Sequence, residues 1–427
     1  MSDLIMNKAQ RLDQADPLRQ FREQFLLPAT DNSPDIYFVG NSLGLQPAGV
    51  ATSLNHVLQL WQHSGVHGHF AGSGGSTAWM DLPQQIADLV APLVGAAPDE
   101  VVVMNTLTVN LHLLLAGFYR PTGTRRKILI EQHAFPSDHH AVASFLRIQG
   151  EDPDETLLTI PATRGGFLFD TGAVLEHITA HSDTLALVLL PGVQYYTGQV
   201  LDIDRITTHA RSLGITIGWD LAHAVGNIPL QLSEWGPDFA CWCSYKYLNG
   251  GPGALGGCFI RSDHCHNTSM QRLAGWWGHE RSTRFQMRPD FVPAADASGW
   301  QLSNPPILSL AAMQPALELF QQAGGMRPLR EKSLQMTQFF RECLQHCCER
   351  RVTVLTPESP AEHGCQLSLE IHADDIAGRH VYNRLLQVGI HTDWREPNVI
   401  RAAPVPLYNT FNEIAHFAQC LARTLQR

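Results

Sequence analysis

The chain has 427 residues, 44% of them hydrophobic, and a formal net charge of −10 at pH 7. One hydrophobic core rarely serves a chain of this length, so we expect at least two domains. The acidic balance argues against a nucleic-acid partner, which selects for a basic surface, and no apolar run is long enough to cross a membrane. The polar N-terminus does not resemble a signal peptide, and the nine cysteines form no disulfide or zinc framework, so the sequence favours a reducing cytoplasm.

Short apolar segments alternate with helical patterns from about residue 100 onward. The expected strands are EVVVMN, KILIEQ, TLALVLLPG and ITIGWD, and they alternate with helix-like segments. Continuous apolar strands in this alternation indicate a mostly parallel sheet that is covered on both faces. The sequence therefore predicts an α/β fold, with ligands at the carboxyl ends of the strands.

The pattern changes after about residue 305. A long helix, ILSLAAMQPALELFQQAGG, is followed by further helices and by short strands such as CQLSLEIH and NVIRAAP. This mixture indicates a smaller α+β domain. We place an N-terminal segment at residues 1–60, the large domain at 61–305 and the small C-terminal domain at 306–427.

Three local patterns resemble sites but lack the context that those sites need. GNSLG at residues 40–44 has the spacing of a hydrolase nucleophile around Ser42, yet Pro47 opposes the helix that must follow directly, so we expect a turn near the active site. Residues 251–256 match G-x-G-x-x-G, but a strand-like GGCFI follows where a dinucleotide site needs a helix. The histidines at 63, 67, 69, 264 and 266 lack a second pair of zinc ligands.

Lys246 is the only one of four lysines in an apolar, aromatic and glycine-rich setting. It follows the strand-like FACWC, and Asp220 ends the preceding strand, with His223 three residues on. A helix cap is the alternative reading of Asp220 alone. An aspartate at one strand end and a lysine beyond the next suit pyridoxal phosphate, because the lysine can form a Schiff base with the aldehyde and the carboxylate can pair with the pyridinium nitrogen.

Two further strand ends supply what such a cofactor needs. NTLTVNLHLLLAGF begins a helix whose backbone N–H groups could bind the phosphate, and Thr108 could add a hydroxyl; the alternative is a plain N-cap threonine. Phe135 follows the next strand and could stack on the ring; the alternative is a core phenylalanine. Asp138 lies three residues further on.

Several longer stretches together resemble the kynureninase family, which consists of pyridoxal-phosphate hydrolases of the aspartate-aminotransferase superfamily. They are AFPSDHHA, WDLAHAVGN, DFACWCSYKYLNGG, WWGHERSTRF, SNPPIL and IRAAPVPLYN. The likeness extends from YFVGNSLGLQP to the C-terminal helix. It implies hydrolysis of L-kynurenine or 3-hydroxy-L-kynurenine to L-alanine and an anthranilate in the kynurenine pathway of tryptophan breakdown, by a cytoplasmic homodimer.

The resemblance also assigns roles to residues. Lys246 would be the Schiff-base lysine, Asp220 would pair with the pyridine nitrogen, and His223 would support the polar edge of the ring. Leu107, Thr108 and Tyr245 would line the phosphate site, and Phe135 would stack on the ring beside Asp138. Trp276 and Asn304 would come from the second subunit of the dimer, and Arg401 would hold the substrate carboxylate bidentately. Tyr245 is also the candidate for activating water.

The remaining matches concern substrate choice. His69, Ser303 and Ser42 correspond to positions where the family contacts the aryl ring, and His69 with the SNPP stretch is similar to animal-type enzymes that favour 3-hydroxykynurenine. Pro191 departs from the family, because relatives often have a serine or threonine there and proline supplies neither a hydroxyl nor an N–H.

Two alternatives stay open from the residues alone. The first is another reaction on the same scaffold, such as an aminotransferase or a cysteine desulfurase that uses Cys365 or Cys258. The second is a non-enzymatic protein that only binds the cofactor, although Arg401 and Asp220 would then be dispensable.

Overall fold

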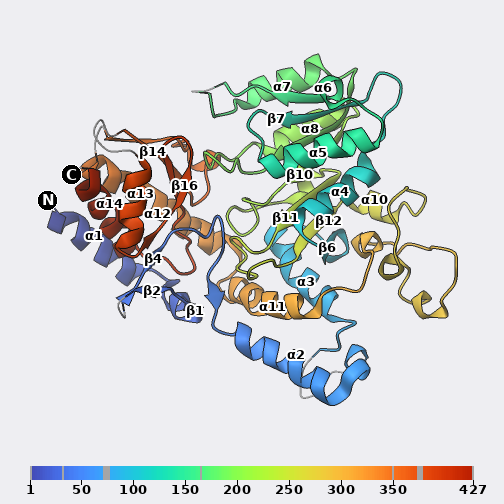
Figure 1. The fold of residues 1–427 in the computed structure, drawn as a ribbon, viewed down its shortest axis with the longest axis horizontal. Coiled ribbons are helices and arrows are strands. Elements are labelled where there is room, and N and C mark those ends of the chain that lie inside the picture. The colour runs from blue at the N-terminus through green and yellow to red at the C-terminus, as the bar shows by residue number, and fades with distance from the viewer. Residues whose placement is uncertain are drawn as a thin grey trace.

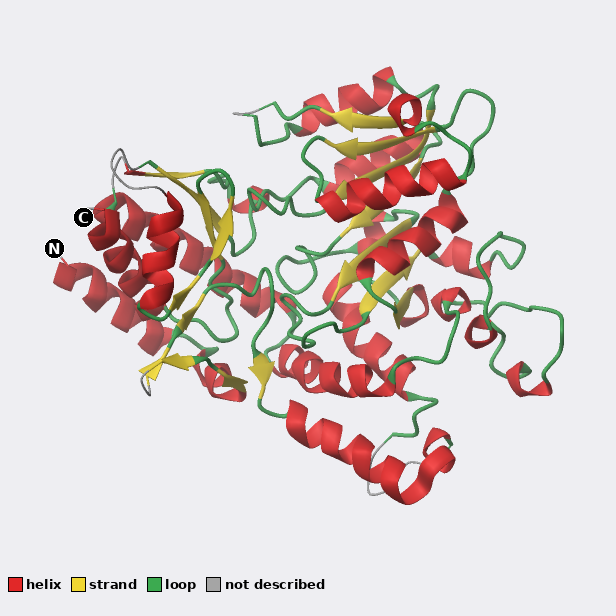
Figure 2. Ribbon diagram, viewed as in Figure 1, coloured by secondary structure: helices red, strands yellow, loops and turns green. Residues whose placement is uncertain are grey.

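The structure is a computed structural model that describes residues 2–30, 33–70, 77–163, 166–348, 351–372 and 378–425. A seven-stranded sheet forms the centre of the larger part of the molecule (Figures 1 and 2). All its strands run parallel except β12, which is antiparallel to both neighbours. In spatial order the strands are β6 (Val101–Met104), β12 (Gly256–Ile260), β11 (Phe239–Cys243), β10 (Thr216–Asp220), β9 (Leu185–Pro191), β7 (Lys127–Glu131) and β8 (Leu157–Ile160).

Helices cover both faces of this sheet and produce three layers. The helices that share a core with the strands on one face are α4 (Leu107–Phe118) and α5 (Pro136–Ile148). Those on the other face are α3 (Leu82–Val94), α7 (Thr171–Ala180), α8 (Ile203–Ser212) and α11 (Ile307–Gln322). The central strands are buried on both faces, which explains their unbroken apolar runs. The α/β fold with a large mixed sheet is thus confirmed.

Glycine at one position of this sheet is required by packing. A Cβ on Gly218 of β10 would lie 2.1 Å from the ring of Phe239 on the neighbouring β11. The aromatic ring therefore occupies the space that a side chain on β10 would need, and the two strands stay in register up to Asp220.

A second sheet, antiparallel and four-stranded, lies near the C-terminus. Its order is β13 (Val352–Val354), β14 (Leu367–Ile371), β17 (Val399–Ala402) and β16 (Asp393–Arg395). It shares a core with α12 (Met326–Cys347), α13 (Gly378–Gln387) and α14 (Phe411–Leu425).

The N-terminal segment packs on this small domain. Helix α1 (Ser2–Ala15) lies against α14, so the two ends of the chain lie side by side in Figure 1. Strand β4 (Ile36–Tyr37) pairs with β15 (Ile390–His391), and the ammonium of the buried Lys332 lies 2.7 Å from a carboxylate oxygen of Asp16.

Helix α11 packs instead on α3 and on α2 (Val50–Ser64), within the core of the large sheet. The domain limits drawn from the sequence remain a prediction, and this packing leads us to propose that the small domain begins within α12. The N-terminal segment, whose strand β4 pairs with β15, would then also belong to the small domain.

The remaining strands and α-helices are short. They are β1 (Phe25–Leu26), β2 (Ala29–Thr30), β3 (Ser33–Pro34), β5 (Gln46–Pro47), α6 (Pro153–Thr156), α9 (Leu232–Trp235) and α10 (Ser262–His266). Among the helices of the described residues, none has the length and apolarity to cross a membrane.

Candidate active site

A pocket lies at the carboxyl ends of β7, β9, β10 and β11, beside the N-terminus of α4. Its lining residues are Leu107, Thr108, Glu131, Phe135, Ser137, Asp138, Pro191, Val193, Tyr195, Asp220, Ala222, His223, Tyr245 and Lys246. Parallel α/β sheets bind their ligands at this edge. The structure therefore brings together the residues that the sequence placed at successive strand ends.

Lys246 lies in the bend after β11 and faces His223 across the pocket. Its Nζ donates a hydrogen bond of 2.9 Å to Nε2 of His223. Burial, together with the charges of Lys246, Arg401 and Arg395, holds the pKa of His223 well below its ordinary value. The imidazole is therefore neutral, and the tautomer with its proton on Nδ1 lets Nε2 accept the hydrogen bond from Nζ.

The Nδ1 of His223 is a buried donor without a hydrogen-bond partner in the described part of the chain. Oδ1 of Asp138 is likewise buried and without a partner there. Buried polar atoms are nearly always hydrogen-bonded, so two orphaned atoms in one pocket indicate a polar ligand.

Three carboxyl groups approach one another on the same side of the pocket. Asp220 ends β10 and accepts a 2.8 Å hydrogen bond from the backbone N–H of Ala222. Burial, followed by the charge of Asp220, raises the pKa of both Asp138 and Glu131 well above the ordinary range. Burial and mutual repulsion thus disfavour additional negative charge in this group, so Asp138 and Glu131 hold their protons to a higher pH than exposed carboxyls do.

The pocket also offers an anion site and an aromatic wall. Thr108, in the first turn of α4, has its Oγ1 2.8 Å from Oγ of Ser137 in the first turn of α5, so two hydroxyls and two helix N-termini converge. The ring of Phe135 is 41% exposed and meets the ring of Tyr195 edge-on at 5.2 Å. Phe135 is thus a pocket wall and not a core residue.

Apart from Arg401, five of the expected site residues do not line this pocket. The ring of His69 lies edge-on to that of Trp79, with 5.1 Å between the ring centres. Nε1 of the half-exposed Trp276 donates a hydrogen bond to the backbone oxygen of Arg284. Ser42, Ser303 and Asn304 are exposed. One chain alone therefore does not bring them to Lys246.

The turn around Ser42 nevertheless touches the segment that carries Lys246. The N–H of Gly44 donates a 2.8 Å hydrogen bond to the backbone oxygen of Tyr245. Strand β5, and no helix, follows this turn, which agrees with the expected turn near the active site and not with a hydrolase nucleophile. The glycine-rich residues 251–256 likewise run into β12 and not into a helix.

Arg401 lies beside the pocket but is buried in the small domain. It is 1% exposed, its Nη1 donates to the backbone oxygen of Tyr195, and its Nη2 pairs with Asp393. Tyr195 lines the pocket, so the guanidinium is one residue removed from the cavity wall.

Sequence reasoning missed Glu131, Ser137 and Tyr195 as lining residues. Glu131 carried a usable signal, because it is an acid at the buried end of a strand, as Asp220 is. Ser137 lies in a stretch noted for its likeness and Tyr195 lies four residues after Pro191, but only the arrangement of the strands in space places them at the pocket.

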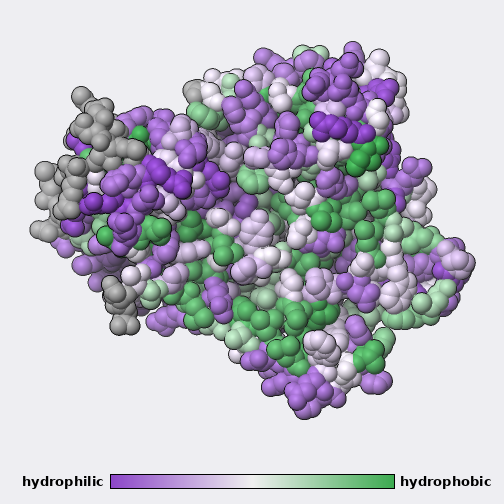
Figure 3. Space-filling view, in the orientation of Figure 1, coloured by the Kyte–Doolittle hydropathy of each residue, from purple (hydrophilic) through white to green (hydrophobic). Residues whose placement is uncertain are grey.

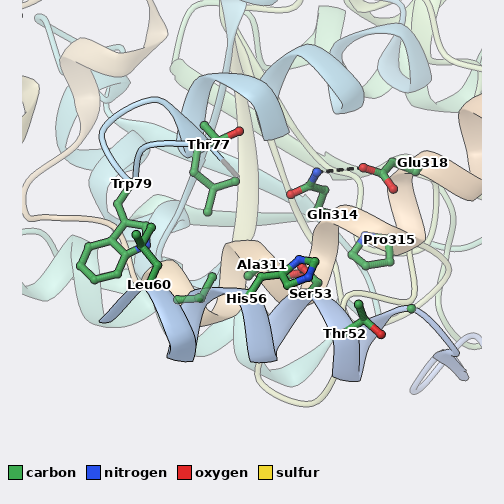
Figure 4. A pocket seen from close by; sticks show the side chains of 13 residues that line it. Thr52, Ser53, His56, Leu60, Thr77, Trp79, Ala311, Gln314, Pro315 and Glu318 are labelled. Carbon is green, nitrogen blue, oxygen red and sulfur yellow. Dashed lines mark hydrogen bonds between the residues drawn. The ribbon is translucent and has the colours of Figure 1, made fainter. Parts of the chain in front are cut away.

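A second cavity lies between α2 and α11, with Trp79 at one end (Figure 4). Among its described lining residues only His56 and Glu318 have ionisable side chains, and Figure 4 shows Glu318 hydrogen-bonded to Gln314. It contains no lysine, so the pocket around Lys246 is the candidate active site.

The pocket around Lys246 fits pyridoxal phosphate on three counts. An amine and a neutral histidine face the cavity, one carboxylate lies at a strand end, and hydroxyls with helix N-termini form an anion site. Pro191 also lines the pocket, so the missing hydroxyl noted from the sequence lies at the site itself.

Comparison with known proteins gives a consistent result. The family model for the kynureninase C-terminal domain matches residues 329–421. A kynureninase from Xanthomonas campestris pv. campestris is 50% identical over 411 residues, which cover 96% of each chain. A kynureninase from Stenotrophomonas maltophilia is 48% identical over 420 residues, 98% of each chain.

Solved structures with the same fold are more distant in sequence. A C-DES mutant with glycine covalently linked to its PLP cofactor has a TM-score of 0.78 at 20% identity and covers 94% of this chain and 98% of its own. The cysteine desulfurase CsdA from Escherichia coli has a TM-score of 0.76 at 17% identity, over 96% and 98%. These likenesses show the fold alone, whereas the near-complete match to curated relatives shows that this chain belongs to the kynureninase family.

Proposed function

We propose that the protein hydrolyses L-kynurenine, or 3-hydroxy-L-kynurenine, to L-alanine and the corresponding anthranilate with pyridoxal phosphate as cofactor. The proposal rests on the pairing of Lys246 with a neutral His223 in a pocket that also holds Asp220, in a chain half identical to named kynureninases. When bound, the cofactor supplies an electron sink that stabilises carbanions on the substrate.

The residues of the chain account for binding and proton movement. Asp220 can offer its carboxylate to a protonated ring nitrogen, and the raised pKa of Asp138 beside it disfavours a second negative charge. Thr108 and Ser137 donate hydroxyls to the phosphate, and Phe135 covers one face of the ring. Lys246 Nζ lies within reach of the same cavity and serves as the base for the proton on the substrate Cα.

Tyr245 suits one of the two roles that the sequence suggested better than the other. Burial raises the pKa of its phenol well above the ordinary value. A phenolate that could deprotonate water is therefore disfavoured at neutral pH, whereas the neutral phenol can still donate a hydrogen bond to a bound anion. We propose Tyr245 as a donor and leave the base for water unassigned.

We further propose a homodimer with shared active sites. In one chain Trp276 and Asn304 lie outside the pocket, and large apolar side chains are exposed nearby on α2, on the segment after it and on residues 273–292. They are Leu58, Trp61, Val66, Phe70, Leu273, Phe285, Met287, Phe291 and Val292. Hydrophobic groups also gather over α11 and beside α2 in Figure 3, as expected of a surface that a partner covers.

Subunit complementation tests the shared site. Inactive Lys246→Ala and Asn304→Ala proteins are mixed under conditions that exchange subunits, and anthranilate is followed by fluorescence. If Asn304 acts across the interface, half of the dimers carry one intact site, so about a quarter of the wild-type activity returns. No recovery from a mixture that sedimentation shows to have exchanged would place Asn304 in its own subunit's site.

The activity itself is tested with purified holoenzyme and each substrate in parallel. Release of anthranilate or 3-hydroxyanthranilate with stoichiometric alanine supports the proposal, and the two rates give the preference. Lys246→Ala should purify without the visible absorbance of the lysine-bound cofactor. A variant that keeps that absorbance would remove Lys246 from the role proposed for it.

The desulfurase alternative lacks a suitable thiol. Cys365 and Cys258 are both buried, and burial raises the pKa of Cys365 to about 12 and that of Cys258 further still. A desulfurase needs a thiolate on an accessible loop, since the thiolate is the nucleophile. The nine cysteines are all unpaired, which supports the cytoplasm as the proposed location.

A further inference from the structure

Two arginines of the small domain share one carboxylate beside the active-site pocket. Asp393 lies directly opposite Arg401 in the pairing of β16 with β17, and its Oδ2 accepts from Nη2 of Arg401. The same carboxylate receives Nη2 of Arg395 at 3.2 Å, and its Oδ1 lies 3.2 Å from Nε of Arg395. Asp393 is thus the common counter-ion of both guanidinium groups.

The charges of this group do not cancel. A guanidinium group stays protonated in proteins, so the two arginines carry two positive charges. The one carboxylate between them leaves the group with a net charge of +1. Arg401 is almost fully buried, yet its Nε–H has no hydrogen-bond partner in the described part of the chain. A buried, unpaired guanidinium donor is costly, so the site lacks one anionic ligand.

The group also lies where a substrate in the pocket would reach it. Arg401 donates to the backbone oxygen of Tyr195, and the guanidinium of Arg395 lies 5.9 Å from the centre of the Tyr195 ring. That ring lines the pocket and meets Phe135. Figure 1 shows β16 on the side of the small domain that faces the large sheet.

The two arginines differ in what they can do. The Arg401 side chain is 1% exposed and is held by two contacts, one to the backbone oxygen of Tyr195 and one to Asp393, whereas the Arg395 side chain is 35% exposed. The guanidinium of Arg401 is therefore held in place, whereas that of Arg395 can move toward a ligand that fills the pocket.

We propose that Arg395 is a second guanidinium for the carboxylate of the amino-acid substrate and that Asp393 is the positioning residue that holds both arginines around it. This inference rests on the proposed function only in taking an α-amino acid as the ligand. It adds Arg395 and Asp393 to a role that the family resemblance assigned to Arg401 alone.

The test compares a ligand that carries the carboxylate with one that does not. Holoenzyme is titrated with L-alanine and with L-alaninamide, and the change in cofactor absorbance gives each dissociation constant. In Arg395→Gln the affinity for L-alanine should fall about tenfold, as expected for the loss of one charge-assisted hydrogen bond, while that for L-alaninamide changes less than twofold. Arg395→Lys should restore part of the difference, because it keeps the charge without the fork.

Asp393→Asn extends the test to positioning. It should raise KM for the substrate while kcat falls less and the affinity for the cofactor stays as it was, because the fork of Arg401 is no longer held. A loss of folding in this variant would show only that the buried Arg401 needs its counter-ion. The Arg395 variants, which change a partly exposed side chain, therefore carry the decision.

Arg379→Gln is the matched control. Arg379 is a partly exposed arginine of the same domain that pairs with Glu396 and not with Asp393, so its loss should leave both ligands' affinities unchanged. An equal change for both ligands in Arg395→Gln, no change for either, or a wild-type protein that does not prefer L-alanine would each overturn the proposal. Absence of anthranilate would instead refute the proposed reaction and leave this comparison valid.

Discussion

Gly44→Ala tests whether the N-terminal turn fixes the position of Lys246. A Cβ at Gly44 would lie 2.4 Å from the backbone oxygen of Lys246, 2.3 Å from Oδ1 of Asn249 and 2.8 Å from its Cα. Real Cβ atoms do not approach backbone atoms so closely, so either the turn or the lysine segment must shift. The turn's 2.8 Å hydrogen bond to the oxygen of Tyr245 lengthens or breaks with it.

Two terms give the size of the effect. Overpacking in a tight contact costs about 1–3 kcal/mol, and the lost backbone hydrogen bond adds about 1 kcal/mol, so the free energy of unfolding should fall by roughly 2–4 kcal/mol. Displacing Lys246 by about 1 Å is enough to lower kcat/KM on the order of a hundredfold. Activity should therefore fall further than the folded fraction does.

The measurements are urea unfolding followed by circular dichroism, and the rate of anthranilate release by the folded protein. Gly172→Ala is the control, because its only close neighbour is the side-chain oxygen of Asp170 at 3.1 Å and it lies in α7, away from the pocket. A Gly44→Ala protein as stable and as active as the control would refute the view that this turn supports the lysine.

Three further predictions address the anion site, a buried histidine and the thiols. Thr108→Ala and Ser137→Ala should each raise the dissociation constant of pyridoxal phosphate about fivefold, measured by fluorescence titration; unchanged values would move the phosphate elsewhere. Burial, aided by nearby arginines, lowers the pKa of His363 to about 4. As the pH falls, the unfolded chain therefore binds a proton at this histidine before the folded chain does. The free energy of unfolding should fall by up to about 3 kcal/mol between about pH 6.5 and 4, and the urea midpoints of His363→Gln should depend less on pH in this range. Iodoacetamide should leave Cys365 and Cys258 unmodified in the folded protein, as mass spectrometry of peptides can check, and rapid labelling of either would revive the desulfurase reading.

The sequence predicted the chemical groups of the pocket more completely than the full set of residues that line it. Asp220, Phe135 and Lys246 could be found because each follows an apolar strand, and parallel strands bring their carboxyl ends to one edge. Tyr195 could not be found in this way, because it follows a turn after β9 and reaches the pocket only through the order of strands in the sheet.

Contacts between distant segments were beyond the sequence for the same reason. The boundary between the large and small domains cannot be predicted from the helical pattern of α11, because its apolar face fits either core. Its packing on α2 and α3 is determined by tertiary contacts. The pairing of β4 with β15 joins residues more than 350 positions apart and leaves no local signal. Asp393 was missed because an acid in a short strand near Arg401 has no distinctive spacing.

A cysteine desulfurase has the same fold as this chain, so a difference in reaction must lie in the side chains of the pocket. In this chain the thiols nearest the pocket, Cys241 and Cys243, belong to a buried strand, and burial raises the pKa of both. They cannot act as nucleophiles, because a thiol must first ionise, whereas Lys246 faces the same cavity and can move the proton of the substrate Cα. A site with buried thiols, a shared carboxylate and a net positive charge for an α-carboxylate is built to transfer an acyl group to water and not sulfur to a cysteine.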